Sequence, residues 1–582
     1  MNSESPPDHN SGPFFDDPLV GILTSTDRGL SIGLDSKANS LYAIINLEER
    51  DSLRLGNFLN VPFFDEENVD ETLLCRIIEL FYHNEFPHEF GTFDASNLLA
   101  EDLNQGNKAV QEIDFNFIAK LQPLSLVHHD KLKDKMFNKP ANRLPRPASR
   151  VYKANENTIS TGLKLSKNPK DIFVGYVSQL LPEKHLPYRF KDRNVIDSIL
   201  FTHVLVAGGT GSGKTQATKN ILRQCLGDQR TYEINGKKRK LAIVQFDPQD
   251  EYAQMYHDGD DLPEDVVRRC EENNILFGQH KDTQVFVPDI GGAKYDSKYH
   301  EAKTTLFSIP FSLVEKNHWL ISRSDLNELQ TSGLTDHILP DFFNKTPEKK
   351  QTYSDFMEFV KENEDNYITE NNSWGDMAPG TYGAIKRRVG VFYNVFSDSQ
   401  ATPITELIDQ FVKPGQLSVV PTPHINNHND ATFVVLALSS LLIDEKLTEH
   451  PKYRGIKDTP LMISMDEAHN FLSKENADTE QGNVLIRKFI RAAKQGRKER
   501  LGLFLVTQDP HDIAADILTQ IGTKVILNLN NDSAIRSLKL PDGLKSQIPN
   551  LPQGDMVIHS PNLRSIPTDV TGISHCLVRH SR

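Results

Sequence analysis

The chain lacks the features that mark secreted and membrane proteins. Its 582 residues include only four cysteines, widely scattered and without a CxxC pair, so the sequence predicts thiols in a reducing compartment and no cysteine-ligated metal. No apolar run approaches the roughly 18 residues that a membrane span needs, and the N-terminus lacks the basic start and apolar core of a signal peptide. We therefore expect a cytoplasmic protein with no membrane segment.

Excess positive charge and internal repeats are also missing. The formal net charge of −14 argues against nucleic-acid binding over the whole surface, although it leaves room for a local basic channel. The sequence shows no repeat at a fixed period, which excludes a solenoid. A chain of this length is too long to fold around a single hydrophobic core, so we expect two or three domains.

The N-terminal part shows short β-type runs. Val20–Ser25, Leu41–Leu47 and Gly56–Phe64 are spaced as in a small barrel or sandwich. We predict a disordered tail at residues 1–18 and a small N-terminal β-barrel domain at residues 19–178. Within that domain we expect a helix at 71–83, an exposed linker near 130–170 and a closing strand at 172–178.

From Thr202 onward, buried strands alternate with helices. Strands apolar on both faces belong in a sheet covered by helices on both sides, which predicts an α/β domain at residues 179–582. Polar, helix-like sequence at about 303–409 is interpreted as a helical insertion. The predicted strands are the apolar runs at 202–208, 241–247, 284–289, 416–422, 461–468, 502–508 and 524–529.

The segment "GGTGSGKT" matches the phosphate-binding pattern G-x-x-x-x-G-K-T and lies between a strand and a helix. Its glycines let consecutive backbone N–H groups point at phosphate oxygens. We expect Lys214 to contact the β- and γ-phosphates of ATP and the Thr215 hydroxyl to ligate Mg²⁺. The residues predicted to contact nucleotide are Gly208, Gly209, Thr210, Gly211, Ser212, Gly213, Lys214, Thr215 and Gln216.

The segment "LMISMDEAHNF" carries two adjacent carboxylates at the end of a buried strand. Such a pair is costly unless a cation or water receives it. We expect Asp466 to hold Mg²⁺ and Glu467 to orient or deprotonate the attacking water. The alternative is that both residues cap the next helix.

Taken together, "HVLVAGGTGSGKT", "VQFDPQDEY", "MISMDEAHNF" and "QGRKERLGLFLVTQDPHDIAADILTQIGTKVIL" resemble the HerA branch of the HerA/FtsK superfamily of hexameric DNA-translocating ATPases. The resemblance covers about residue 172 to the C-terminus apart from the insertion, and implies a RecA-like P-loop core. One position departs from the family pattern, because Asp250 stands where Asp-Pro-x-Gly-Glu-Tyr has glycine, which puts the local turn in doubt.

The resemblance also implies several roles. Gln508 matches the polar residue that senses the γ-phosphate. A basic residue near the glycine-arginine-lysine turn is expected to reach a neighbouring subunit's ATP, and Arg491 and Arg497 are the candidates, with Arg500 third. The alternative for each arginine is a solvated helix end. "NGKKRK", residues 235–240, is interpreted as a hairpin turn in preference to a DNA-contacting pore loop.

With this resemblance, the chain is predicted to be an ATP-hydrolysing DNA translocase or helicase, and the family implies a ring, a hexamer, around double-stranded DNA. The family implies a nuclease or NAD-consuming effector as partner, in DNA end processing or anti-phage defence. Two alternatives stay open: an ATP-controlled scaffold that activates its partner, and a secretion-type motor that moves protein or single-stranded DNA.

Overall fold

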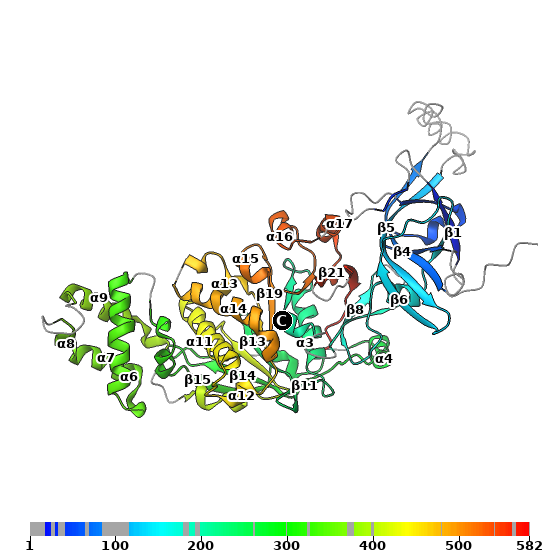
Figure 1. Ribbon diagram of the computed structural model, residues 1–582. Coiled ribbons are helices and arrows are strands. Elements are labelled where there is room, and N and C mark those ends of the chain that lie inside the picture. The colour runs from blue at the N-terminus through cyan, green and yellow to red at the C-terminus, as the bar shows by residue number, and fades with distance from the viewer. Residues whose placement is uncertain are drawn as a thin grey trace, which may run out of the picture. The chain divides into compact units, whose positions relative to one another are not determined.

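The computed structural model in Figure 1 describes residues 18–24, 30–32, 41–63, 69–83, 116–178, 185–192, 198–259, 262–297, 300–322, 326–368, 377–396, 401–478, 480–540, 542–561 and 566–580. Contacts divide the chain into two units, residues 1–167 with 177–186, and residues 168–176 with 187–582. The predicted tail lies outside the described residues except for its last position. Within the described ranges, no helix has the length and apolar character to cross a membrane.

The first unit is built on a seven-stranded antiparallel sheet in which β2 pairs with both β1 and β5. Side chains alternate between its faces, so that Leu41, Ala43 and Ile45 of β2 are buried in the core. The strand order is β2 (Leu41–Ile45), β1 (Leu19–Thr24), β7 (Arg150–Lys153), β3 (Phe58–Phe63), β4 (Val69–His83), β5 (Asn116–Asp130) and β6 (Lys135–Pro140).

The helix predicted at residues 71–83 is wrong, because these residues form most of strand β4. The strand pairs with β3 on one side and β5 on the other. Leu73, Cys75 and Ile77 face the core at every second position. The apolar residues of this run fit both a helical and a strand period, and pairing with distant strands decides between them.

The predicted linker near 130–170 is also wrong, because it contains β6, β7 and the helix α2 (Glu156–Gly162). Strand β6 lies at the edge of the sheet, and most of its side chains are exposed. Lysine and proline are common on edge strands, where they discourage further pairing. A Lys- and Pro-rich sequence therefore resembled a linker while forming a strand.

The second unit contains a thirteen-stranded sheet. In the order in which the strands lie side by side, the first nine, which begin with β16 and end with β20, are parallel. The large parallel sheet confirms the α/β class, and all seven predicted strands are present. The order is β16 (Thr402–Pro403), β15 (Lys303–Ser308), β14 (Thr283–Pro288), β17 (Leu417–Pro421), β13 (Ala242–Asp247), β18 (Leu461–Met465), β19 (Leu501–Thr507), β10 (Val204–Ala207), β20 (Thr523–Ile526), β21 (Asp555–His559), β22 (Thr568–Thr571), β8 (Ile172–Val177) and β9 (Pro187–Phe190).

Strand β8 corrects a further expectation. It was predicted to close the first domain, but it joins the second sheet, where it pairs with β9. The apolar run of β8 is buried throughout, as is usual inside a sheet covered on both faces. Periodicity identifies such a run as a strand, but it does not identify the strand's partner.

The predicted helical insertion at 303–409 is correct for its middle and wrong at its ends. Its central helices are α5 (Glu328–Ser332), α6 (Leu339–Lys345), α7 (Tyr353–Glu362), α8 (Glu364–Ile368) and α9 (Pro379–Val389). The insertion begins with β15 and ends near β16, which lie at the sheet edge. The first four residues of β15 are exposed or half-buried and mostly polar. The strand therefore lacks the continuous apolar run by which the other strands were predicted.

Within the described ranges, long helices pack close to the central strands. Helix α11 (His428–Leu447) contacts α14 (Glu480–Glu499), and α14 contacts β19. Strands β10, β13, β18 and β19 are neighbours and parallel, so their carboxyl ends meet at one edge of the sheet. Ligands of open α/β sheets bind at this edge.

Candidate nucleotide-binding site

The phosphate loop joins β10 to α3 (Lys214–Cys225). Gly211 and Gly213 have φ values of +79° and +94°, a left-handed conformation that glycine adopts without strain. Gly208 N donates to Thr507 O at 3.2 Å, and Gly209 N donates to Asn528 O at 2.7 Å. The loop is thus fixed to the chain on both sides, and the N-terminus of α3 follows it directly, as in an anion-binding site.

Two carboxylates follow β18 at the same edge of the sheet. Asp466 is 1% exposed, and its backbone N–H donates to Phe246 O at 3.1 Å. Glu467 has φ +44°, an uncommon conformation for a residue with a side chain. Such backbone strain gathers at functional sites, where it directs a side chain away from the path of its strand.

The carboxylate of Glu467 is the meeting point of the site. Its Oε1 lies 3.8 Å from Lys214 Nζ, accepts a hydrogen bond of 3.0 Å from Gln249 Nε2, and accepts another from Gln508 Nε2. Its Oε2 lies 3.5 Å from His469 Nδ1 and has no hydrogen bond within the described part of the chain. Four segments of the chain therefore each place one nitrogen-bearing side chain around a single carboxylate.

Gln508 is at the end of β19, as predicted, and touches both halves of the site. Besides donating to Glu467, it accepts a hydrogen bond of 2.9 Å from the hydroxyl of Thr210 in the phosphate loop. The structure thus brings the predicted residues Lys214, Glu467 and Gln508 together.

Burial dominates the electrostatics of the acidic residues. Burial, together with the nearby charges of Glu467 and Asp247, raises the pKa of Asp466 to about 7, and the charge of Lys214 opposes the shift. Burial also raises the pKa of Asp247 to about 7, although hydrogen bonds from Tyr252 N and from the backbone of Glu251 oppose the shift. Carboxylates held this way are stabilised by a cation.

The donor set fits Mg²⁺. This ion prefers oxygen ligands and typically takes one or two carboxylates, with substrate phosphates and water completing the octahedron. Asp466 and the hydroxyl of Thr215, on the first turn of α3, are the residues that would hold it.

Sequence reasoning missed two of the four side chains around Glu467. Gln249 lies inside the quoted segment "FDPQDEY", and His469 follows the acidic pair by two positions, so both were near recognised motifs. His469 Nδ1 also lies 3.2 Å from the hydroxyl of Thr507. Their contacts depend on neighbouring strands that are far apart in sequence.

Asp250 answers the doubt about the turn after β13. Its φ is +58°, the left-handed conformation that glycine would adopt, and aspartate tolerates this region better than most residues. Its Oδ1 accepts a hydrogen bond of 2.5 Å from Tyr295 OH. The substitution therefore keeps the turn and adds an anchor.

Gln216 faces the C-terminal segment, defined here as residues 573–580. Its side-chain amide donates to Ile573 O at 2.9 Å. One turn further along α3, Lys219 Nζ donates to Arg579 O at 3.2 Å, and Asn220 exchanges hydrogen bonds with His575 O and Leu577 N. The C-terminal segment thus lies along the helix that follows the phosphate loop, and a nucleotide contact by Gln216 stays a prediction.

The basic stretch before β19 is helical to Glu499, which corrects the predicted turn. Arg491 and Arg497 lie on α14, and only Arg500 lies in the turn, with φ +55°. Arg491 Nη1 is 3.8 Å from Asp444 Oδ1, and its side chain is 48% exposed. Residues up to Glu499 favour a helix and place apolar side chains at every third or fourth position. The helix therefore continues almost to β19, and a cluster of charged residues does not by itself indicate a turn.

The predicted hairpin at 235–240 is confirmed. Strands β11 (Thr231–Ile234) and β12 (Lys237–Lys240) pair antiparallel, and Asn235 and Gly236 both have positive φ, as a tight hairpin turn requires. A DNA contact by its lysines stays a prediction.

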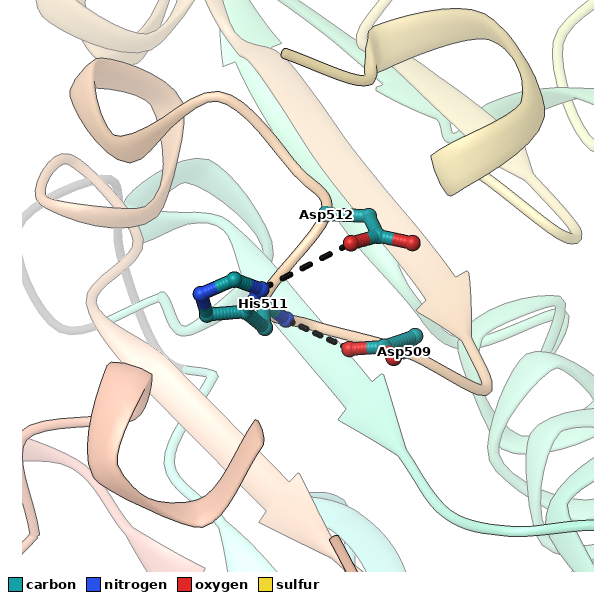
Figure 2. A group of neighbouring side chains, drawn as sticks. All are labelled: Asp509, His511 and Asp512. Atoms are coloured by element: carbon teal, nitrogen blue, oxygen red, sulfur yellow. Dashed lines mark hydrogen bonds and ion pairs between the residues drawn. The ribbon is translucent and has the colours of Figure 1, made fainter. Parts of the chain in front are cut away.

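Asp509, His511 and Asp512 form a further group just after β19, and Figure 2 shows their side chains on one loop. Asp509 Oδ1 accepts a hydrogen bond of 2.9 Å from His511 N, and His511 Nδ1 is 3.6 Å from Asp512 Oδ1. His511 and Asp512 are about half exposed. These bonds shape the turn itself, and we assign no metal to it.

Comparison with known proteins supports the same family. Residues 193–442 match the family model described as "Helicase HerA, central domain". A 211-residue stretch is 26% identical to the DNA double-strand break repair helicase HerA of Saccharolobus solfataricus, covering 35% of this chain and 40% of that protein. Over 121 residues, the chain is 35% identical to the HerA helicase of Pyrococcus furiosus, covering 20% and 21% of the two proteins.

The matched stretches thus span less than half of these relatives. Among solved structures, the chain is similar to VirB4 of Thermoanaerobacter pseudethanolicus, with a TM-score of 0.43, 12% identity, and coverage of 72% of this chain and 98% of that one. This likeness is too distant to indicate a function.

Proposed function

Because the chain belongs to the HerA-like P-loop ATPases of the HerA/FtsK superfamily, we propose that it is an ATP-driven DNA translocase or helicase. The observation that carries the proposal is the Glu467 carboxylate, which lies beside Lys214 of the phosphate loop and Gln508, the residue after β19. An acid, a cation and an amide that converge from separate segments of the chain can bind a triphosphate and activate water at one point.

Phosphate binding is the task of the loop and Lys214. The backbone N–H groups of Gly211 and Gly213 and the N-terminus of α3 provide donors for phosphate oxygens, and the ammonium of Lys214 neutralises charge on the β- and γ-phosphates. Bound Mg²⁺ would neutralise phosphate charge that grows in the transition state. Asp466 and Thr215 are the residues that would hold it.

Hydrolysis is the task of Glu467 with Gln508. Glu467 accepts a proton from a water molecule as its oxygen bonds to the γ-phosphorus and the bond to the bridging oxygen breaks, giving ADP and phosphate. Gln508 donates to Glu467 and accepts from Thr210, and these two bonds support a role in sensing the γ-phosphate. Arg491 or Arg497 of a neighbouring subunit would stabilise the transition-state charge.

The assembly and biological setting belong to the same proposal. The family resemblance supports a RecA-like core, a hexameric ring, double-stranded DNA in its pore and a cytoplasmic location. It also supports a nuclease or NAD-consuming partner in DNA end processing or anti-phage defence. The N-terminal unit is proposed to be a small β-barrel, a reading supported by the second pairing of β2 with β5.

The test compares wild type with Glu467→Gln in ATP binding and in ATP hydrolysis, with and without duplex DNA. We expect the variant to bind ATP and to lose hydrolysis, because the amide cannot accept the proton. Glu358→Gln on α7, an exposed residue of the insertion, is the control for the same change in charge and should match wild type. Normal turnover by Glu467→Gln would overturn the assignment, and turnover that DNA leaves unchanged would favour the ATP-controlled scaffold.

A further inference from the structure

Gln249 is an exposed residue whose amide reaches the proposed catalytic carboxylate. It lies in the turn after β13, and its Nε2 donates to Glu467 Oε1 at 3.0 Å. An exposed glutamine normally points into water, where its rotamers are free. Its bond to a carboxylate that is itself buried therefore calls for a physical explanation.

The turn that carries Gln249 is tied down on both sides. Asp247, which is fully buried, accepts hydrogen bonds from Gln249 N at 3.3 Å and from Tyr252 N at 2.8 Å. Asp250 accepts from Tyr295 OH at 2.5 Å, and the same hydroxyl is 2.8 Å from His300 Nε2. These hydrogen bonds fix the backbone at Gln249, so the side-chain amide extends towards Glu467 from a fixed position.

The other two donors to the same oxygen have different tasks. Lys214 and Gln508 both act on phosphate in the proposed reaction, so the ion pair of Lys214 and the hydrogen bond of Gln508 with Glu467 compete with a bound γ-phosphate. Gln249 comes from neither the phosphate loop nor β19, which makes it the donor that can stay on Oε1 through the reaction. With Oε1 held, Oε2 keeps its lone pairs for a proton, since it makes no hydrogen bond among the described residues and its neighbour His469 Nδ1 is 3.5 Å away.

We propose that Gln249 is a positioning residue that holds Glu467 by Oε1 and aims Oε2 at the attacking water. The proposal rests on the function proposed above. It also gives Asp250 and Tyr295 a task, because they fix the turn from which the amide reaches out. A carboxylate that swings about its side-chain torsions would spend less time aligned with water, and misplacement of about 1 Å can cost a hundredfold in rate.

The experiment measures kcat and KM for ATP in the full chain with duplex DNA. Gln249→Met keeps the length of the side chain but cannot donate, and Gln249→Glu keeps the shape but places a second carboxylate beside Glu467. We expect Gln249→Met to lower kcat by about tenfold to a hundredfold with KM changed by less than about twofold, as for residues that orient a catalytic group. Gln249→Glu should lose at least as much because like charges repel.

Gln520→Met, a substitution of the same kind on a partly exposed glutamine near α15 (Ala515–Leu518), is the control and should leave both constants unchanged. An unchanged midpoint temperature of thermal unfolding for each variant would exclude a folding defect. A wild-type kcat for Gln249→Met would overturn the inference, and so would an increased kcat, which would make the amide a brake. Failure of the proposed function is distinct, because wild type itself would then show no ATP hydrolysis in the same assay.

Discussion

The hydroxyl of Thr210 and the side-chain amide of Gln508 are joined by a hydrogen bond of 2.9 Å, across 298 residues of sequence. The other end of the same amide donates to Glu467. A rigid, planar group thus links the phosphate loop to the proposed base. Any shift of the loop that moves Thr210 also changes the position from which Gln508 acts on Glu467.

Gln508→Leu is expected to separate binding from hydrolysis. The leucine fills similar space but bonds neither Thr210 nor Glu467, so kcat should fall by about a hundredfold or more, as on removal of a transition-state donor. The Kd for ATP should change by only a few fold, because Lys214 and the loop backbone remain. Fluorescent-nucleotide titration and steady-state hydrolysis measure the two effects, and an equal loss of both would contradict the role given to Gln508.

Gly213→Ala should destabilise the protein and weaken ATP binding. Gly213 has φ +94°, and an added Cβ would lie 3.4 Å from Gly554 N. A left-handed residue with a Cβ costs about 1–2 kcal/mol. Gly383→Ala is the matched control because Gly383 lies inside α9 with open space around its Cβ position. Alanine there should stabilise the protein by up to about 1 kcal/mol in urea unfolding.

Arg491→Ala and Arg497→Ala are expected to differ. The guanidinium of Arg491 is placed on Asp444 of its own chain, in a half-exposed pair whose loss should cost about 1 kcal/mol or less. Arg491→Ala should therefore keep most of the ATP hydrolysis, and Arg497→Ala should lose it.

Mixing tests whether Arg497 acts across subunits. Inactive Arg497→Ala combined with inactive Lys214→Ala should recover activity, because some interfaces pair an intact arginine with an intact phosphate loop. No recovery in the mixture would argue that the loss arises within one chain.

His203 should make the second unit sensitive to acid. Burial lowers its pKa to about 4, and both ring nitrogens are used, because Nδ1 lies 3.1 Å from Leu503 N and Nε2 lies 2.9 Å from Ala493 O. The unfolded chain has the ordinary histidine pKa of about 6.5. The contribution of the neutral imidazole to the free energy of unfolding is therefore fully present above about pH 6.5 and is lost as the pH falls towards 4.

Urea unfolding at pH 7.5 and pH 5 measures this effect. His203→Gln should be less stable than wild type at pH 7.5 but should lose less stability between the two pH values. Equal losses for wild type and variant would show that other groups cause the acid sensitivity.

The sequence predicted the parallel strands and the centre of the site because both are local signals. Strands such as β13 and β18 are short runs of apolar residues, and the phosphate loop and the Asp466-Glu467 pair each lie within a few consecutive positions. Which strands pair with one another is not a local property of the sequence. Strand β8 and strand β4 were assigned wrongly because the choice of neighbour depends on segments far away in the chain.

The same distinction holds within the site. Gln508 was found through family resemblance, whereas Gln249 was missed, although it lies in a motif that had been noticed. Its partner Glu467 is 218 residues away, just after the neighbouring strand β18, and no spacing rule connects them. Asp250 shows the reverse case, in which a departure from the family pattern raised a doubt that its backbone conformation removes.

The C-terminal segment along α3 offers a way to watch the nucleotide site from outside it. Because Lys219 and Asn220 hold residues 575–579 only one turn beyond the phosphate loop, a fluorophore attached at Cys576 would sit close to any movement that ATP causes in that helix. Cys576 is partly exposed, whereas the other three cysteines are buried. The chain thus carries a natural labelling position for following each turnover in real time.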